Sequence, residues 1–263
     1  MKRVFLIDIG NSALKWAEAS TPQNTGVVVY GDEVALAEQV RDFYLTQRPD
    51  VIYGCTVADA RIAEAVRRVC YGARVEWLGS QPRFAGAITL ENSYEDYTKL
   101  GADRWYAALG AVGKHPGSSL LVVQMGTALT ADSIRCEGEG RYRYLGGRIA
   151  PGPTMMFNML RAGAARLKGI ERGVFRRFPL NTNDAVTEGV MGCIEGFIRS
   201  GLRSFDGEAA PRLVITGGAA KFFEREIREH FPESVLDDNL VITGLSLRVE
   251  SEATEARRHG QGL

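Results

Sequence analysis

Short apolar runs that end in turn residues alternate along this chain with longer stretches of helical spacing. The run from Val4 to Ile9 is rich in β-branched residues and stops at Gly10, which predicts a strand followed by a turn. From Asp32, an expected N-cap, apolar residues recur with the period of a helix. The first half is predicted as strands over 4–9, 14–19 and 26–30, a helix from 32, a strand over 50–55, a helix over 58–69, a strand over 73–78 and a helix over 102–112.

The second half repeats this order of elements. Strands are predicted over 119–124, 129–134, 141–149 and 213–216, and helices over 153–167, 184–203, 221–229 and 243–257. The two halves differ in sequence, so the repeat is one of pattern, and it predicts an α/β duplication with the order βββαβαβα in each half. Gly and Pro near 114–118 favour a hinge there. We therefore expect an N-terminal domain over 1–116, a C-terminal domain over 117–263 and a ligand cleft between them.

Composition narrows the classes of function. The 32 Lys and Arg residues balance the 32 Asp and Glu residues, so no net charge attracts nucleic acid or an anionic membrane surface. The four scattered cysteines form no zinc-type spacing with the three histidines, and each is expected to be a small buried side chain in a reducing cytosol. No apolar stretch approaches the roughly 20 residues of a membrane span, and Asp8 interrupts the apolar start before it could act as a secretory signal. We expect a soluble, cytoplasmic protein.

Two similar turns carry the first candidate chemistry. Asp8 precedes the Gly10 turn, and Gln124 stands in the same place before Gly126 in the second half. A glycine there lets backbone amides approach a phosphate, Lys15 can neutralise its charge, and Asp8 can hold magnesium directly or through water. A tight β-turn without a ligand uses the same residue types for local reasons. Two matched turns nevertheless favour a polyphosphate that is held from both halves.

A glycine pair and several missing motifs refine this interpretation. Gly217 and Gly218 follow the strand predicted over 213–216 and offer a flat backbone surface for a purine, although a plain connection would use them equally well. The chain has no GxxxxGK[ST] segment, no GxGxxG after a strand and no GxSxG elbow. The sequence therefore disfavours a P-loop enzyme, a Rossmann dehydrogenase and an α/β-hydrolase, and favours a different kind of nucleotide clamp.

An acid and a guanidinium stand side by side at the expected start of the helix over 102–112. Asp103 can accept a proton from a substrate hydroxyl or orient it, and Arg104 can bind an anionic group. The loose transition state of phosphoryl transfer leaves positioning and charge neutralisation as the main tasks, so an Asp of ordinary pKa suffices. A carboxylate in the first turn is also favoured by the helix dipole, so a purely structural role for Asp103 stays open.

Taken together and in this order, the motifs resemble type III pantothenate kinase. The matching segments are Asp8 to Ser12 with Lys15, Asn92 with Tyr94, Leu100 to Trp105, Gly126 to Thr130, Gly146 to Gly152, Asn181 with Thr182, and Thr216 to Gly218. The resemblance implies two RNase H-like domains of the acetate and sugar kinase/Hsp70/actin type, with a nucleotide cleft between them, in a homodimer. It also implies ATP-dependent phosphorylation of pantothenate at its 4'-hydroxyl, the first step of coenzyme A biosynthesis.

The same resemblance implies roles for single residues. Asp103 matches the proton acceptor, and Asp8 is expected to hold Mg²⁺. The positions implied to bind ATP and its phosphates are Asp8, Ile9, Gly10, Asn11, Ser12, Ala13, Leu14, Lys15, Gly126, Thr127, Gly217 and Gly218. The positions implied to contact pantothenate are Tyr94, Gly101, Ala102, Asp103, Arg104 and Thr182.

Two positions depart from the family pattern. Many members have Asp at the position of Gln124, where it helps to bind a monovalent cation, K⁺ or NH₄⁺, that supports ATP binding. A neutral amide keeps only its carbonyl oxygen for that purpose, or it bridges backbone groups where the ion otherwise sits. Tyr97 stands where a proline is common in the family, so this departure bears on the conformation of the loop and not on the chemistry. Two other functions stay open: another small-molecule kinase of the superfamily, and a non-catalytic nucleotide-binding accessory or regulatory protein.

Overall fold

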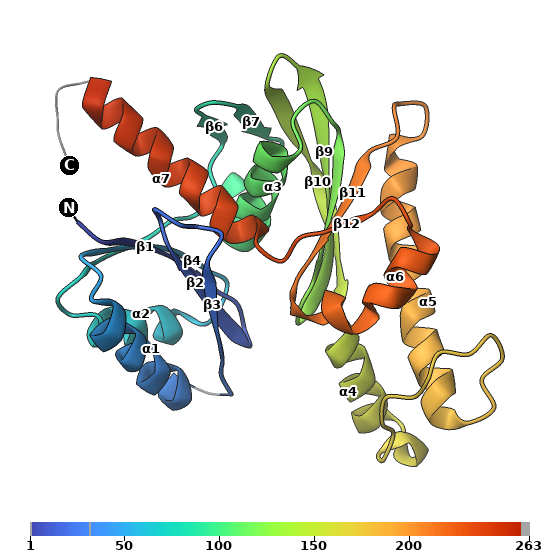
Figure 1. Ribbon diagram of the computed structural model, residues 1–263. Coiled ribbons are helices and arrows are strands. Elements are labelled where there is room, and N and C mark those ends of the chain that lie inside the picture. Colours follow the sequence, from blue (N-terminus) through green and yellow to red (C-terminus); the bar gives the residue numbers. More distant parts are fainter. Residues whose placement is uncertain (1, 32, 259–263) are drawn as a thin grey trace. The chain divides into compact units, whose positions relative to one another are not determined.

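The computed structural model describes residues 2–31 and 33–258, which form a mixed α/β structure with two sheets (Figure 1). The chain packs into two compact units. The first unit comprises the described residues of Met1–Gly117, Cys136–Leu145 and Asn239–Leu263, and the second comprises Ser118–Arg135 and Gly146–Asp238. Each unit therefore contains segments that are distant in sequence, and the division into domains over 1–116 and 117–263 stays a prediction.

The first unit contains a five-stranded sheet. Its strands lie in the order β3 (Thr25–Val29), β2 (Ala13–Glu18), β1 (Val4–Ile9), β4 (Val51–Thr56) and β5 (Arg74–Trp77). β1 is antiparallel to β2 and parallel to β4. Alternate residues of a strand point to opposite faces. Phe5, Ile7 and Ile9 therefore lie in a core with the helices α1 (Glu33–Gln47) and α2 (Ala60–Val69), and Asp8 points to the other face.

Besides residues 136–145, the rest of the first unit has short strands and two helices that pack together. These elements are β6 (Arg83–Ala85), β7 (Thr89–Asn92), the 3-10 helix η1 (Tyr97–Lys99), α3 (Ala102–Lys114) and α7 (Leu240–Arg258). α3 and α7 approach closely because a glycine of each helix meets the backbone of the other. A Cβ at Gly110 would collide with the carbonyl oxygen of Leu240, and one at Gly244 would collide with that of Tyr106. The last helix of the chain thus packs against α3.

The second sheet repeats the strand order of the first. Within the described ranges it has seven strands, in the order β12 (Val235–Leu236), β11 (Arg212–Thr216), β8 (Leu120–Met125), β9 (Ala128–Gly138), β10 (Arg141–Pro151), β7 and β6. β8 is antiparallel to β9 and parallel to β11, as β1 is to β2 and β4. The order from β10 to β12 matches that from β3 to β5, which confirms the predicted α/β duplication.

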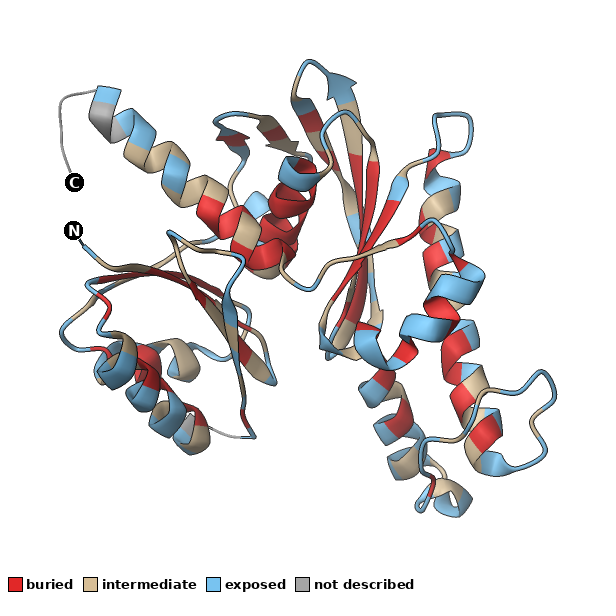
Figure 2. Cartoon of the chain, in the orientation of Figure 1, coloured by how far each residue is buried: buried red, intermediate tan, exposed pale blue. Residues whose placement is uncertain are grey.

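Helices of the second unit bury one face of its strands. They are α4 (Pro153–Gly163), η2 (Ala165–Leu167), α5 (Thr182–Leu202), η3 (Arg203–Phe205), η4 (Gly218–Phe223) and α6 (Glu224–His230). Leu121, Val123 and Met125 of β8 form a core with Ile194 and Ile198 of α5. Figure 2 shows buried residues along the central strands and on one side of α5, which is how an amphipathic helix packs on a sheet.

Most elements follow the predicted ranges, and the differences have local causes. The helix predicted over 153–167 ends at Gly163 and continues as the separate turn η2, because Ala164 is extended. The helix predicted over 221–229 is divided into η4 and α6. β6, β7 and β12 were missed because two to four residues are too few to show a period. The N-cap predicted at Asp32 lies outside the described residues.

The cysteines are less uniform than expected. Cys55 and Cys70 are fully buried, whereas Cys136 is half-buried and Cys193 is exposed, so the expectation that all four are buried was wrong. Cys193 lies on α5, where it lines a groove of the second unit. Among the helices that the structure describes, none is both long and apolar enough to span a bilayer.

Candidate active site

The end of β1 gathers charged and polar side chains from three strands. The strand register pairs Asp8 with Lys15 of β2 on one side and with Cys55 of β4 on the other. Directly paired residues project to the same face of a sheet, so the three side chains share the face opposite the α1–α2 core. The Sγ atom of Cys55 lies 3.6 Å from Oδ1 of Asp8 and donates a hydrogen bond to it.

This environment perturbs the Asp8 carboxyl. Burial, and after it the negative charge of Asp103, raises the pKa of Asp8 to about 7, while Lys15 and the thiol of Cys55 act in the opposite direction. Burial, and after it the charge of Asp8, raises the pKa of the Cys55 thiol well above its usual value, so the thiol stays protonated and donates. A divalent cation would relieve the repulsion between the two carboxylates.

The residues at this end of β1 fit magnesium. Asp8 provides a carboxylate oxygen, the ligand that Mg²⁺ prefers, beside a second acidic group. No group of three or more His, Cys, Asp or Glu side chains within the described ranges forms a complete metal cage. A site of one carboxylate completed by water and substrate phosphates is the usual arrangement for Mg²⁺.

Asp103 stands in the first turn of α3. Its Oδ1 atom accepts a hydrogen bond of 2.8 Å from the main-chain N–H of Arg104. The N-cap residue Gly101 leaves room for this carboxylate, because a Cβ there would lie 2.6 Å from Oδ1. The side chain stays half-exposed, whereas the neighbouring Ala102 is buried. Asp103 therefore serves the helix start and still presents a carboxylate oxygen to a ligand.

Arg104 and Tyr94 form an adjoining pair in the same unit. Arg104 is only 4% exposed, and its guanidinium carbon lies 6.0 Å from the centre of the Tyr94 ring. Tyr94 packs edge-on against the buried Tyr144 at 6.3 Å, and its main-chain N–H donates to Oδ1 of Asn92. A guanidinium held beside an aromatic face binds carboxylate or phosphate groups strongly. Of the predicted pantothenate contacts, the structure thus brings Tyr94, Arg104 and Asp103 into one unit.

The first predicted phosphate turn joins β1 to β2. Its backbone closes through a 3.0 Å hydrogen bond from the N–H of Gly10 to the carbonyl of Ala13. Asn11 and Ser12 are exposed at its tip. Ile9 and Leu14 flank the turn, but their side chains are buried in the core, which leaves their main-chain groups for a ligand.

The second predicted turn joins β8 to β9 and is one residue shorter. The N–H of Gly126 donates to the carbonyl of Ala128 at 2.9 Å, and the carbonyl of Thr127 accepts from the N–H of Gly152 at 2.9 Å. Gly126 and Thr127 are exposed. A Cβ at Gly152 would collide with the carbonyl oxygens of Gly126 and Thr127, so the backbone after β10 needs glycine to lie against this turn.

The predicted glycine pair has two different environments. Gly217 has a φ of +99°, and a Cβ there would collide with the backbone of Met125 at the end of β8. The fold therefore requires glycine at position 217. Gly218 begins η4, and a Cβ there would meet nothing within 4 Å, so its surface is open to a ligand.

Gln124 lies in a neutral polar row across three strands. The register pairs it with Thr130 of β9 and Thr216 of β11. Its Nε2 atom and the Oγ1 atom of Thr130 are buried without a hydrogen-bond partner among the described residues. A cation takes oxygen ligands and is favoured by negative charge, whereas this row offers an unsatisfied N–H donor and no carboxylate. The row therefore keeps neutral oxygen atoms but lacks the carboxylate that the family pattern offers a monovalent cation at this position.

Thr182 lies in the second unit, whereas Tyr94, Asp103 and Arg104 belong to the first. It is the first residue of α5, is exposed, and follows Asn181, which caps the helix by accepting from the N–H of Asp184 at 2.9 Å. Thr182 lines an apolar groove of about 1050 Å³, whose other walls include Met156, Met159 and Leu180.

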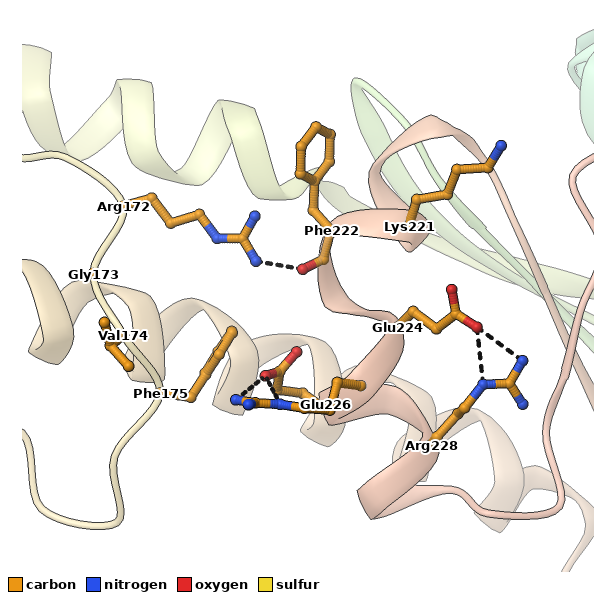
Figure 3. A pocket seen from close by; sticks show the side chains of 10 residues that line it. Arg172, Gly173, Val174, Phe175, Lys221, Phe222, Glu224, Glu226 and Arg228 are labelled. Carbon is orange, nitrogen blue, oxygen red and sulfur yellow. Dashed lines mark hydrogen bonds and ion pairs between the residues drawn. The ribbon is translucent and has the colours of Figure 1, made fainter.

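A second pocket of about 730 Å³ lies elsewhere in this unit, between residues 172–175 and the η4–α6 segment (Figure 3). Arg172 donates to the carbonyl oxygen of Phe222, and its guanidinium lies 5.2–6.0 Å from three phenylalanine rings. Glu224 and Arg228 form an ion pair of 2.9 Å. None of the predicted site residues lines this pocket.

Two residues of the first site were missed in the sequence. Cys55 reaches Asp8 only because β4 pairs in register with β1, and Tyr30 contacts the Gly10 turn only because β3 returns beside it. Both were assigned to the core or to a strand. These two residues could have been identified only from the strand register, and the spacing of residues along the sequence does not reveal that register.

Comparison with known proteins identifies the family of this chain. The model of the type III pantothenate kinase family matches residues 4–203. The type III pantothenate kinase of Acidovorax ebreus is 36% identical over 258 residues and covers 91% of this chain and 93% of its own. That of Laribacter hongkongensis is 32% identical over 248 residues and covers 92% of this chain and 97% of its own.

Solved structures extend the likeness of the fold. A Campylobacter jejuni protein described as a Baf family transcriptional activator has a TM-score of 0.57 at 20% identity, covering 97% of this chain and 99% of its own. A ROK family glucokinase from Streptomyces griseus, solved with glucose and AMPPNP, has a TM-score of 0.53 at 11% identity, with coverages of 94% and 98%. These two likenesses concern the fold alone. The family match and the relatives above 30% identity span most of the sequence, and this chain belongs to the type III pantothenate kinase family.

Proposed function

We propose that this protein transfers the γ-phosphoryl group of ATP to the 4'-hydroxyl of pantothenate, the first step of coenzyme A biosynthesis. Family membership supports the reaction. The observation that carries its assignment to particular residues is the electrostatic coupling of Asp8 and Asp103, two acids from β1 and α3 in one unit. One acid next to a phosphate turn and one at a helix start match the two tasks of a small-molecule kinase.

Asp103 acts on the acceptor. Its half-exposed carboxylate accepts a hydrogen bond from the 4'-hydroxyl, orients the oxygen toward the γ-phosphorus and takes the proton as the new bond forms. Its own bond from the N–H of Arg104 fixes the orientation of the carboxylate at the helix start. Arg104, buried beside Tyr94, binds an anionic group of the substrates, either the pantothenate carboxylate or the transferred phosphate.

The turns at Gly10 and Gly126 bind the phosphates of ATP through main-chain N–H groups. Lys15 neutralises phosphate charge, and Asp8 holds Mg²⁺ directly or through water. When bound, Mg²⁺ supplies charge neutralisation for the phosphate oxygens. The open backbone at Gly218 supports the assignment of the Gly217–Gly218 pair to the purine, and the exposed Thr182 is assigned to pantothenate.

The protein acts in the cytoplasm as a homodimer. An apolar groove of about 1050 Å³ between α4 and α5, with Leu180 92% exposed at its wall, supports self-association, because monomers rarely leave such a surface uncovered. Sedimentation of the wild-type protein and of Leu180→Asp tests it. A dimer that the substitution weakens is expected, and a wild-type monomer at working concentrations would contradict it.

The reaction does not require a monovalent cation. The neutral row of Thr130, Gln124 and Thr216 supports this, because its neutral oxygen atoms attract a cation less strongly than the carboxylate that many family members have at this position.

The direct experiment is mass-spectrometric detection of phosphopantothenate after incubation of the purified protein with ATP, Mg²⁺ and pantothenate, with and without K⁺ or NH₄⁺. Product in both conditions is expected. If the folded protein binds nucleotide and forms no product in either condition, the acceptor is a different compound or the protein is a nucleotide sensor.

A further inference from the structure

Tyr30 is the residue that directly follows β3, and it contacts both ends of the first phosphate turn. Its main-chain N–H donates to the carbonyl of Ser12 at 3.1 Å. Its phenolic hydroxyl donates to the carbonyl oxygen of Gly10. The side chain is only 8% exposed, and its ring packs in the core with Leu36 of α1. The hydroxyl is therefore held at the turn by a rigid, buried ring.

The contact with Gly10 fixes a peptide group that can bind phosphate. The carbonyl of Gly10 and the N–H of Asn11 belong to one planar trans peptide, so they point in opposite directions. A hydroxyl that holds the Gly10 oxygen toward Tyr30 therefore holds the Asn11 N–H away from Tyr30. Asn11 is exposed at the tip of the turn, so a phosphate can approach this peptide.

The hydroxyl stays a donor under working conditions. Burial, and after it the negative charge of Asp8, raises the pKa of Tyr30 above its ordinary value. The phenol is therefore protonated throughout the neutral range and has a proton for the Gly10 carbonyl.

The second unit provides an independent parallel. There, the residue that directly follows the third strand of the repeat is Gly152, and its N–H donates to Thr127 as that of Tyr30 does to Ser12. Gly152 lies so close to the Gly126 carbonyl that it has no space for a Cβ. In both units, then, the residue after the third strand restrains the carbonyl of the turn glycine. A hydroxyl does this in one unit, and close backbone packing does it in the other.

We propose that Tyr30 is a positioning residue for nucleotide binding. Its hydroxyl holds the Gly10–Asn11 peptide so that the N–H of this peptide faces the ATP phosphates. This inference rests on the proposed function of the Gly10 turn. It predicts a defect in nucleotide binding and none in the handling of pantothenate.

The test compares Tyr30→Phe with a matched control, Tyr53→Phe. Tyr53 is a buried tyrosine of the same sheet, 5% exposed, whose hydroxyl accepts from Arg74 at 2.9 Å. Both substitutions keep the ring and remove one hydrogen-bonded hydroxyl, but only Tyr30 contacts the turn. Affinity for ADP with Mg²⁺ is measured by calorimetry, KM for ATP and KM for pantothenate by steady-state kinetics, and folding by the melting temperature.

Tyr30→Phe is expected to weaken ADP binding and raise KM for ATP by roughly 3- to 10-fold, the effect of one hydrogen bond. KM for pantothenate should not change, and Tyr53→Phe should match the wild type in both affinities. Wild-type ADP affinity in Tyr30→Phe would overturn the proposal, and so would an equal loss in Tyr53→Phe. The ADP titration does not depend on the acceptor, so it remains decisive even if the wild-type protein forms no phosphopantothenate.

Discussion

The Gly10 turn and the Gly126 turn occupy the same place in a repeated fold but have different chemistry. Each turn follows the first strand of its repeat, β1 or β8, and in each the glycine N–H closes the turn onto an alanine carbonyl. Before the first turn stands Asp8, coupled to Lys15 and Asp103; before the second stands the neutral Gln124 between two threonines. Duplication has thus kept the backbone, while among the described residues in direct register with Asp8 and Gln124 the charged side chains are at the first turn.

Under the proposed function, this difference assigns different roles to the two turns. The first turn combines a carboxylate of raised pKa, a lysine and a buried thiol donor, which suits a metal ion and reacting phosphate. The second turn is built by close backbone approach at Gly152 and Gly217, which suits binding of phosphate by N–H groups alone. Substitutions at equivalent positions should therefore have unequal effects.

Among substitutions at the two turns, the largest effect is expected from removing the charge at the first turn. Asp8→Asn should lower kcat/KM by about 10²- to 10³-fold, because the metal and the phosphates lose a carboxylate partner. Gln124→Asn, the matched change at the second turn, should have a much smaller effect. Steady-state kinetics over a range of Mg²⁺ concentrations measures both, and equal losses in the two variants would remove the distinction between the turns.

The same carboxyl predicts a pH dependence in the absence of metal and nucleotide. Because its pKa is raised, the folded protein binds more protons at Asp8 than the unfolded chain between about pH 4 and pH 7. The contribution of Asp8 to stability is therefore greatest at low pH and is lost as the pH rises through about 7. Asp8→Asn should have the higher melting temperature above pH 7, and Mg²⁺ should bind the wild-type protein more weakly below pH 7.

An intermediate effect is expected from replacing a glycine at either turn by alanine. Gly152→Ala should lower the free energy of unfolding by about 1–3 kcal/mol, because its Cβ collides with two carbonyl oxygens. At Gly10 a Cβ would meet only the Ala13 carbonyl oxygen at 3.5 Å, an ordinary contact, so Gly10→Ala should fold normally and weaken ADP binding. Denaturant unfolding and calorimetry separate the two outcomes. A stable Gly152→Ala protein would contradict the close packing described for the second turn.

The smallest effect is expected from giving the second turn an acid. Gln124→Asp should make activity depend on K⁺ or NH₄⁺ by about 3- to 10-fold, because a buried carboxylate without a counter-ion is unfavourable. The wild-type enzyme should show no such dependence when K⁺ is replaced by a bulky organic cation. A strong cation requirement in the wild type would show that Gln124 has not replaced the ion.

Local signals predicted much of the fold. The apolar run from Val4 to Ile9 and its Gly10 turn are readable from adjacent residues, and the helix start at Ala102 carries its acid with it. The close packing of Gly110 against α7 and the return of that helix to the first unit depend on residues more than a hundred positions apart. No local pattern records such a contact.

The site was predicted unevenly for the same reason. Asp8 and Asp103 could be singled out as candidates because turns and helix starts place acids in recognisable positions. Tyr30 and Cys55 were not, because each acts across a strand pairing that spacing does not reveal. Ile9 and Leu14 match the family motif, yet their side chains belong to the core.

The most direct measurement compares phosphopantothenate formation by the wild-type protein and Asp103→Asn, with ADP affinity measured in parallel. The wild type should form product from ATP, Mg²⁺ and pantothenate, and Asp103→Asn should lose about 10²- to 10⁴-fold in turnover while it binds ADP normally. Unchanged turnover in Asp103→Asn would contradict its role as proton acceptor. A folded wild-type protein that binds ADP and forms no phosphopantothenate would contradict the proposed reaction itself.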